Sequence, residues 1–206
     1  MASPHPTVLL ITDWTIGSDL LRARLQAALS VCEPGQVAVQ HRHPGATGHD
    51  FYEEAVALKI RCDAHQAPLF INGRLDIALA LGCHLHLSAS AQPVAEYAAH
   101  LPRGTLVSTS VHNGNEAQRA RGADFVLLAP LFAPKSKPSD TRAVLGIDEF
   151  NTLRASVTSH VFALGGIDAD NAHLLPRDCG VATVSAVLYN SAPADALRKL
   201  LSALQR

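Results

Sequence analysis

The sequence predicts an α/β protein, a single-domain (β/α)8 or TIM barrel, and three observations support this fold class. Short apolar runs alternate with amphipathic segments along the chain of 206 residues. The runs are rich in Val, Leu, Ile and Phe and poor in charge, which is typical of parallel strands buried on both faces. Eight such units of about 25 residues favour a closed barrel over an open, doubly wound sheet.

The predicted strands are the apolar runs themselves, each about four to six residues long. Parallel neighbours need crossover connections, and the segments between the runs are long enough to supply them as helices. In chain order the predicted strands are Val8–Thr12, Val37–Arg42, Leu69–Asn72, His84–Leu87, Leu106–Ser110, Phe125–Ala129, Val161–Leu164 and Val181–Ser185.

The predicted helices carry apolar residues at helical spacing. Leu21, Leu25 and Leu29 form one stripe, and Val56 and Ile60 are expected to form another. The last segment also has a proline in its first turn, where proline fits a helix. The clearest helical segments are residues 19–29, 52–60, 75–81, 115–120 and 193–204.

The composition excludes several classes of protein. Apolar residues make up 48% of the chain and charged residues 17%, which argues against disorder. The net charge of -1 gives no field that would attract nucleic acid or an anionic membrane. No apolar run approaches the ~18 residues of a spanning helix, and the first residues lack a secretory signal pattern. We therefore expect one cytoplasmic domain over residues 1–206, with neither nucleic acid nor a membrane as partner.

A phosphate site is predicted where the seventh and eighth strands end. Ligands bind at the carboxyl ends of the strands in parallel α/β proteins, and barrels often hold a phosphate between these two loops. Glycines let backbone N–H groups approach the oxygens, and a helix N-terminus adds a favourable dipole. We expect Gly165, Gly166, Val184 and Ser185 to bind this phosphate. The alternative is an ordinary strand-to-helix turn that uses glycine for its backbone freedom.

The loop after the sixth strand is a candidate lid. Residues 133–138 contain two of the four lysines of the chain among prolines that prevent a helix. We expect Ser136 and Lys137 to contact an anionic ligand from this loop. A solvated surface loop is the alternative.

Two His-x-His pairs also raise the option of a transition-metal site. His41 with His43, and His84 with His86, each place both members on the same side of a strand. For His84 and His86, packing of both rings into the barrel wall or core explains the pattern equally well, and we expect no metal ion.

Taken together, the motifs resemble the thiamine phosphate synthase/TenI family of small (β/α)8 barrels. Each motif alone is weak, but they occur in the family's order over about residues 8–190. The matching segments are Gln40–Arg42, Ile71–Gly82, His84–Leu87, Ser110–His112, Gly122–Val126, Ala129–Phe132, Lys137-Pro138, Leu145-Gly146, Ala163–Ile167 and Val184–Ala186.

The resemblance implies one of two chemistries. The synthases join a hydroxymethylpyrimidine diphosphate to a thiazole phosphate with the help of magnesium. TenI-like members include a thiazole tautomerase, which moves a proton to aromatise a carboxythiazole phosphate. The resemblance also implies that Gln40, Arg42, Asn72 and Ser110 bind the substrate. We assign His112, just past the fifth predicted strand, as the general acid and base, because an unperturbed histidine titrates near the operating pH. A histidine that caps the next helix or packs under the lid is the alternative.

The chain departs from the synthase pattern at its diphosphate and metal positions. The diphosphate-binding lysine is replaced by Pro44, and the two metal-binding aspartates are replaced within Asn72-Gly73 and Ser88–Ala91. Magnesium usually takes one or two carboxylates together with its phosphates. We therefore expect no cofactor, with magnesium required only if the chain is a synthase.

These departures favour an isomerase, a thiazole tautomerase-like enzyme with a phosphorylated thiazole or another thiamine-pathway phosphate as its ligand. One alternative is a transferase, thiamine phosphate synthase itself. Another is a non-catalytic protein that binds thiamine-pathway phosphates. The sequence leaves open the exact substrate and the oligomeric state, with a homodimer among the options.

Overall fold

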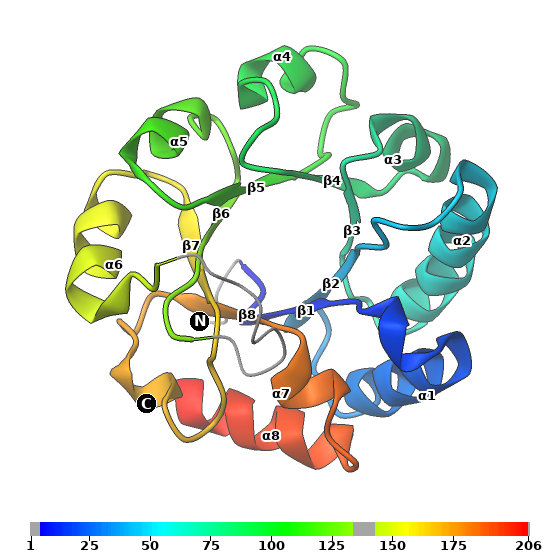
Figure 1. Cartoon of the computed structure of the whole chain (residues 1–206). Helices are drawn as coiled ribbons and strands as arrows, with labels where there is room; N and C mark the ends of the chain where they lie inside the picture. Colours follow the sequence, from blue (N-terminus) through cyan, green and yellow to red (C-terminus); the bar gives the residue numbers. More distant parts are fainter. Residues whose placement is uncertain (1–4, 134–142, 206) are drawn as a thin grey trace.

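Eight parallel strands close into a barrel with a ring of helices outside it (Figure 1). The computed structural model describes residues 5–133 and 143–205. Each strand pairs with the next along the chain, and β8 pairs with β1. The predicted (β/α)8 fold is therefore confirmed. The strands are β1 (Val8–Ile11), β2 (Val37–His41), β3 (Leu69–Asn72), β4 (His84–Leu87), β5 (Val107–Val111), β6 (Phe125–Leu128), β7 (His160–Leu164) and β8 (Gly180–Thr183).

The helices follow the strands and cover the outer face of the barrel. All five predicted helical segments lie in helices, although their ends shift by up to four residues. The predicted strand 181–185 is too long, because β8 ends at Thr183 and Ser185 begins a helix. The helices are η1 (Trp14–Ile16), α1 (Ser18–Leu29), α2 (Gly48–Ala64), α3 (Leu75–Leu81), α4 (Val94–Ala98), α5 (Gly114–Arg119), α6 (Gly146–Ala155), η2 (Ala172–Leu174), α7 (Ser185–Leu188) and α8 (Pro193–Leu204).

The apolar stripe predicted for α2 is wrong. Ile60 is 66% exposed, and Val56 is only partly buried. The helix begins earlier than expected, at a cap where the Thr47 hydroxyl accepts a hydrogen bond from the Asp50 N–H. The added turn brings Phe51 into the core. Ile60 does not lie on the buried face of the helix that contains Phe51. The stripe predicted for α1 is confirmed, since its three leucines are buried.

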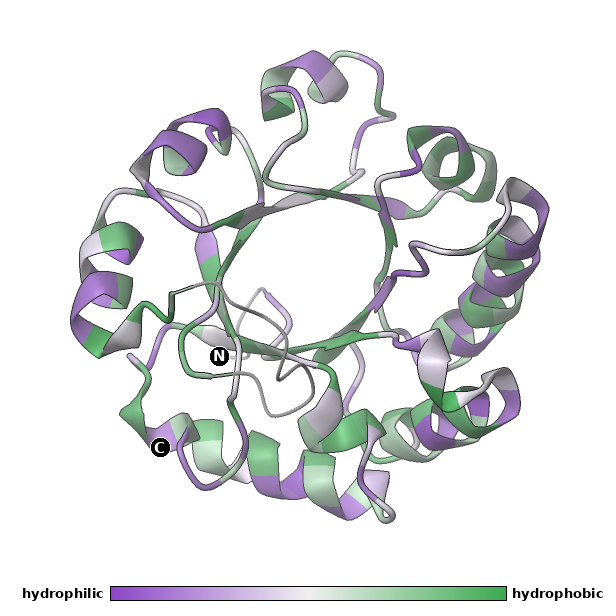
Figure 2. Cartoon of the chain, in the orientation of Figure 1, coloured by the Kyte–Doolittle hydropathy of each residue, from purple (hydrophilic) through white to green (hydrophobic). Residues whose placement is uncertain are grey.

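Side chains alternate along the strands between the barrel interior and the layer of helices. The strands and the barrel-facing sides of the helices are largely apolar, whereas the outward sides are more polar (Figure 2). Aromatic residues fill the amino-terminal half of the interior, and polar residues follow toward the carboxyl ends of the strands. Packed at its amino-terminal end, the barrel leaves space for a ligand at its carboxyl-terminal end. The inner apolar cluster is Leu9, Ile11, Ala38, Phe70, Phe125, Leu127, Phe162 and Ala182.

Among the described helices, none combines the length and the apolar character needed to cross a membrane.

Candidate active site

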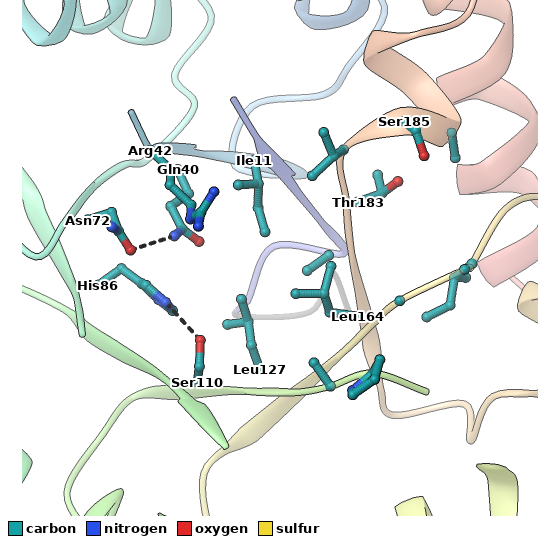
Figure 3. A pocket seen from close by; sticks show the side chains of 18 of the residues that line it. Ile11, Gln40, Arg42, Asn72, His86, Ser110, Leu127, Leu164, Thr183 and Ser185 are labelled. Carbon is teal, nitrogen blue, oxygen red and sulfur yellow. Dashed lines mark hydrogen bonds between the residues drawn. The ribbon is translucent and has the colours of Figure 1, made fainter. Parts of the chain in front are cut away.

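A pocket of about 460 Å³ opens at the carboxyl ends of the strands (Figure 3). Every predicted site residue in the described part of the chain lines this pocket, including His112 and the Gly165-Gly166 pair. Ser136 and Lys137 lie outside the described residues. The polar lining residues are Gln40, Arg42, Asn72, His86, Ser88, Ser110, His112, Asp168, Thr183 and Ser185.

The wall formed by β2 and β3 carries a pair of amide side chains. Gln40 Nε2 donates a hydrogen bond to Asn72 Oδ1 at 3.2 Å (Figure 3). The Gln40 side chain is 2% exposed, and its Oε1 is buried without a hydrogen-bond partner among the described residues. Direct contact between this oxygen and a ligand would require the side chain to turn. Substrate binding by Gln40 and Asn72 stays a prediction.

His86 occupies the interior beside this wall and connects two serines of β5. Its Nδ1 lies 2.8 Å from Ser108 Oγ, and its Nε2 lies 3.2 Å from Ser110 Oγ. Burial, with a smaller effect of the Arg42 charge, lowers the pKa of His86 to about 3. The ring is therefore neutral near pH 7, with one nitrogen donating and the other accepting. Apart from its place in the matching segment His84–Leu87, His86 is predicted from the sequence only as a metal ligand or a packing residue. Its inward position in β4 is the feature that could have indicated that His86 lines the pocket.

His112 follows β5 and is held by a carboxylate. Its Nδ1 lies 2.8 Å from Glu116 Oε2, and its backbone N–H donates to the same oxygen at 2.7 Å. Asn113 caps α5 by accepting from the Glu116 N–H at 3.0 Å. Glu116 is not among the site residues predicted from the sequence, although an Asn followed three residues later by Glu is a helix-start pattern. A carboxylate at this position orients the imidazole, as in sites that transfer protons.

The glycine pair after β7 is required by the packing of the chain. Gly165 and Gly166 have φ values of +109° and +64°. A Cβ atom on Gly166 would lie 2.6 Å from the Ala133 carbonyl oxygen and 2.9 Å from Phe132 Cβ. The turn explanation for these glycines is therefore sufficient by itself, and a phosphate role for them stays a prediction.

The helix after β8 is short and contributes little to an anion site. α7 has four residues, about one turn, so it has only a small dipole to offer an anion. Its first N–H groups still have no acceptor within the helix. In the loop after β7, Asn171 Nδ2 donates a hydrogen bond to the Gly166 carbonyl oxygen at 2.8 Å and fixes the loop. Backbone N–H groups and the Ser185 hydroxyl are thus the available phosphate donors.

We expect Ser185→Ala to weaken the binding of a phosphorylated ligand by roughly 10- to 100-fold, because a hydrogen bond to a charged group contributes about 1.5–3 kcal/mol. Gly166→Leu should weaken it further, since the new side chain collides with residues 132–133. Calorimetric titration with a thiazole phosphate measures both effects, with Ser202→Ala on the exposed face of α8 as control. Wild-type affinity in both pocket variants would exclude a phosphate at this position.

The first His-x-His pair lies outside the barrel interior, at the carboxyl end of β2. His41 Nε2 lies 3.6 Å and His43 Nδ1 lies 2.9 Å from Glu54 Oε2. His41 is fully buried, and burial lowers its pKa to about 4. Over residues 5–133 and 143–205, no group of three or more His, Cys, Asp or Glu side chains could hold a metal ion.

Comparison with known proteins identifies the family. A family model described as thiamine monophosphate synthase matches residues 8–188 of this chain. The chain belongs to this family. Similar proteins are named thiamine-phosphate synthases, and the chain is accordingly a protein of thiamine biosynthesis.

Relatives in this family match the chain over nearly its full length. The thiamine-phosphate synthase of Chloroflexus aurantiacus is 34% identical, covering 95% of this chain and 96% of that protein. The one from Methanoculleus marisnigri is 36% identical, covering 93% of this chain and 92% of the relative. A solved structure, thiamine phosphate pyrophosphorylase from Pyrococcus furiosus, superposes with a TM-score of 0.81 at 25% identity, covering 97% and 95%. These names favour the synthase alternative over the expected tautomerase, which no comparison confirms.

Proposed function

We propose that this member of the thiamine monophosphate synthase family is an isomerase that moves a proton on a carboxylated thiazole phosphate. The proposal rests on the set of side chains that the pocket brings together. The pocket joins a carboxylate-held histidine, His112, to the cation Arg42 and to the loop at Gly166. A ligand with an anion at each end would place its ring beside His112.

In this proposal Arg42 pairs with the ligand carboxylate, since a guanidinium binds a carboxylate through two parallel hydrogen bonds. Ser185 and the N–H groups around Gly166 hold the phosphate. His112 removes a proton from one carbon of the ring system and returns it to another carbon. Glu116 keeps the imidazole oriented and stabilises its charged form between the two transfers.

The positions that carry magnesium ligands in the synthases do not fit a magnesium ion in this chain. Gly73 has no side chain, and Ser88 Oγ is paired with Ser90 Oγ at 3.1 Å. The one carboxylate among the described lining residues is Asp168, on the loop after β7. Magnesium prefers charged oxygen ligands, so the strand ends at β3 and β4 offer it little. The proposed reaction therefore contains no metal-dependent step.

Magnesium is expected to change the affinity for a thiazole phosphate by less than about twofold, because the positions after β3 and β4 that carry the magnesium ligands in the synthases have no carboxylate in this chain. Titrating magnesium chloride against EDTA during a binding assay measures this. Gly73→Asp is a useful companion variant, since it restores one acid at the position where the family has it. A strong, saturable magnesium requirement in the wild-type protein would contradict the proposal.

Thiamine phosphate synthase is the second candidate, and the names of the relatives favour it. Two parallel reactions of the purified protein separate the candidates. One contains the carboxythiazole phosphate tautomer with EDTA, and the other contains hydroxymethylpyrimidine diphosphate, thiazole phosphate and magnesium. The isomerase changes the absorbance of the tautomer without changing its mass. Release of diphosphate in the second reaction alone would favour the synthase.

A further inference from the structure

Thr12, one residue beyond β1, connects its side chain to the backbone of the next strand. Its Oγ1 accepts a hydrogen bond from the Arg42 N–H at 2.9 Å and donates one to the Arg42 carbonyl oxygen at 3.2 Å. Thr12 is 2% exposed. A single hydroxyl thus contacts both backbone polar groups of the residue that supplies the cation of the pocket.

The third bond of this hydroxyl comes from an indole. Trp14 Nε1 donates to Thr12 Oγ1 at 3.2 Å and also to His41 Nδ1 at 3.3 Å. A hydroxyl has one hydrogen and two lone pairs, and all three are now used. The orientation of Thr12 is therefore fixed. The indole is itself held, since its ring stacks on His43 with 6° between the planes.

The position of Arg42 explains why this contact matters. β2 ends at His41, and the last backbone bond from β1 to β2 is donated by the Thr12 N–H to the Gln40 carbonyl oxygen at 2.9 Å. Arg42 is therefore the first residue beyond the ladder. The Thr12 hydroxyl acts as an additional rung and extends the ordered backbone to the base of the Arg42 side chain.

We propose that Thr12 is a positioning residue for Arg42. It does not line the pocket, so it acts by holding the backbone from which the guanidinium reaches the pocket (Figure 3). The proposal rests on the proposed function, because the guanidinium is taken to bind the carboxylate of the ligand. A long, flexible arginine loses less conformational freedom on binding when its backbone is already fixed.

Two matched substitutions test this role. Thr12→Val keeps the shape of the side chain but removes the hydroxyl, and Thr12→Ser keeps the hydroxyl. We expect Thr12→Val to weaken the binding of the carboxylated thiazole phosphate about tenfold. This is a coupling energy typical of residues in one hydrogen-bond network. The same thiazole phosphate without its carboxylate should bind with wild-type affinity. Thr12→Ser should restore the affinity for the carboxylated ligand.

A double-mutant cycle with Arg42→Ala distinguishes positioning from a general structural effect. Once the guanidinium is gone, Thr12→Val should cause no further loss of affinity. Far-ultraviolet circular dichroism, which does not depend on the indole bonded to Thr12, reports whether each variant is folded. If Thr12→Val does not fold, Thr12→Ala, which also lacks the hydroxyl, takes its place in the cycle.

An equal loss of affinity for both ligands, or an undiminished loss in the Arg42→Ala background, would overturn the positioning role. A wild-type protein that binds the carboxylated ligand without converting it would refute only the proposed reaction, because the cycle measures binding. A wild-type protein that binds neither ligand would overturn both proposals.

Discussion

His112→Ala is expected to lower turnover of the carboxythiazole phosphate tautomer by ~10²–10⁴-fold, the usual contribution of general acid–base catalysis. Its affinity for a thiazole phosphate should stay within about threefold of wild type, because the anion contacts come from other parts of the pocket. Steady-state rates measured by absorbance, together with calorimetric affinities, give both quantities. The combination separates loss of a catalytic group from loss of the pocket.

Glu116→Gln and His49→Ala are the comparison variants. The glutamine keeps the size of the side chain that holds His112 but removes its charge, so a smaller loss of turnover is expected. His49 is exposed on α2, away from the pocket lining, and its replacement should have no effect. Wild-type turnover in His112→Ala would exclude the assigned role. So would a loss of ligand affinity that accounts for the whole effect.

Acid is expected to destabilise the fold through its buried histidines. Burial lowers the pKa of His41 to about 4, against about 6.5 for an unfolded chain. Between these values the unfolded chain binds more protons than the folded one, so stability falls as the pH falls through this window. For the fully buried His41 the loss is about 3 kcal/mol by pH 4. Urea unfolding from pH 7.5 to 4 measures it.

His41→Gln isolates this contribution. Glutamine can accept from Trp14 Nε1 and donate to the Phe51 carbonyl oxygen, as His41 does, but it does not titrate. The variant should be less stable than wild type at pH 7.5 and approach it at acidic pH, because only wild type loses the contribution of His41. Ser202→Ala, at an exposed position of α8 without a titrating group, should run parallel to wild type. Parallel curves for His41→Gln and wild type would show that His41 does not titrate on unfolding.

The fold was predictable because barrel strands buried on both faces form continuous apolar runs, and these runs alone gave all eight strands. The helix faces were less predictable. Ile60 has the right spacing for a stripe with Val56, but which face of α2 is buried depends on where the helix starts and on Phe51. That register is decided by the Thr47 cap and by packing on β2 and β3, which helical spacing alone does not specify.

The residues that line the pocket could be predicted as well as the carboxyl ends of the strands, because they follow those ends. Arg42, His112 and Ser185 converge because parallel strands bring their carboxyl ends to one edge. The supporting contacts were not predictable, because they join residues through side chains. Thr12, after β1, contacts Arg42, after the neighbouring strand β2. His86 of β4 contacts Ser110 of the neighbouring strand β5. No pattern within one segment of the sequence shows such pairings.

The most direct test of the proposed reaction is mass spectrometry of the carboxythiazole phosphate after incubation with the wild-type protein and EDTA, in water and in heavy water. The proposed reaction gives an aromatic product of unchanged mass in water. In heavy water the product should contain deuterium, because an imidazole N–H exchanges with solvent before the proton returns to carbon. His112→Ala should give little product in either solvent. A tautomer that the wild-type protein leaves unchanged would contradict the account.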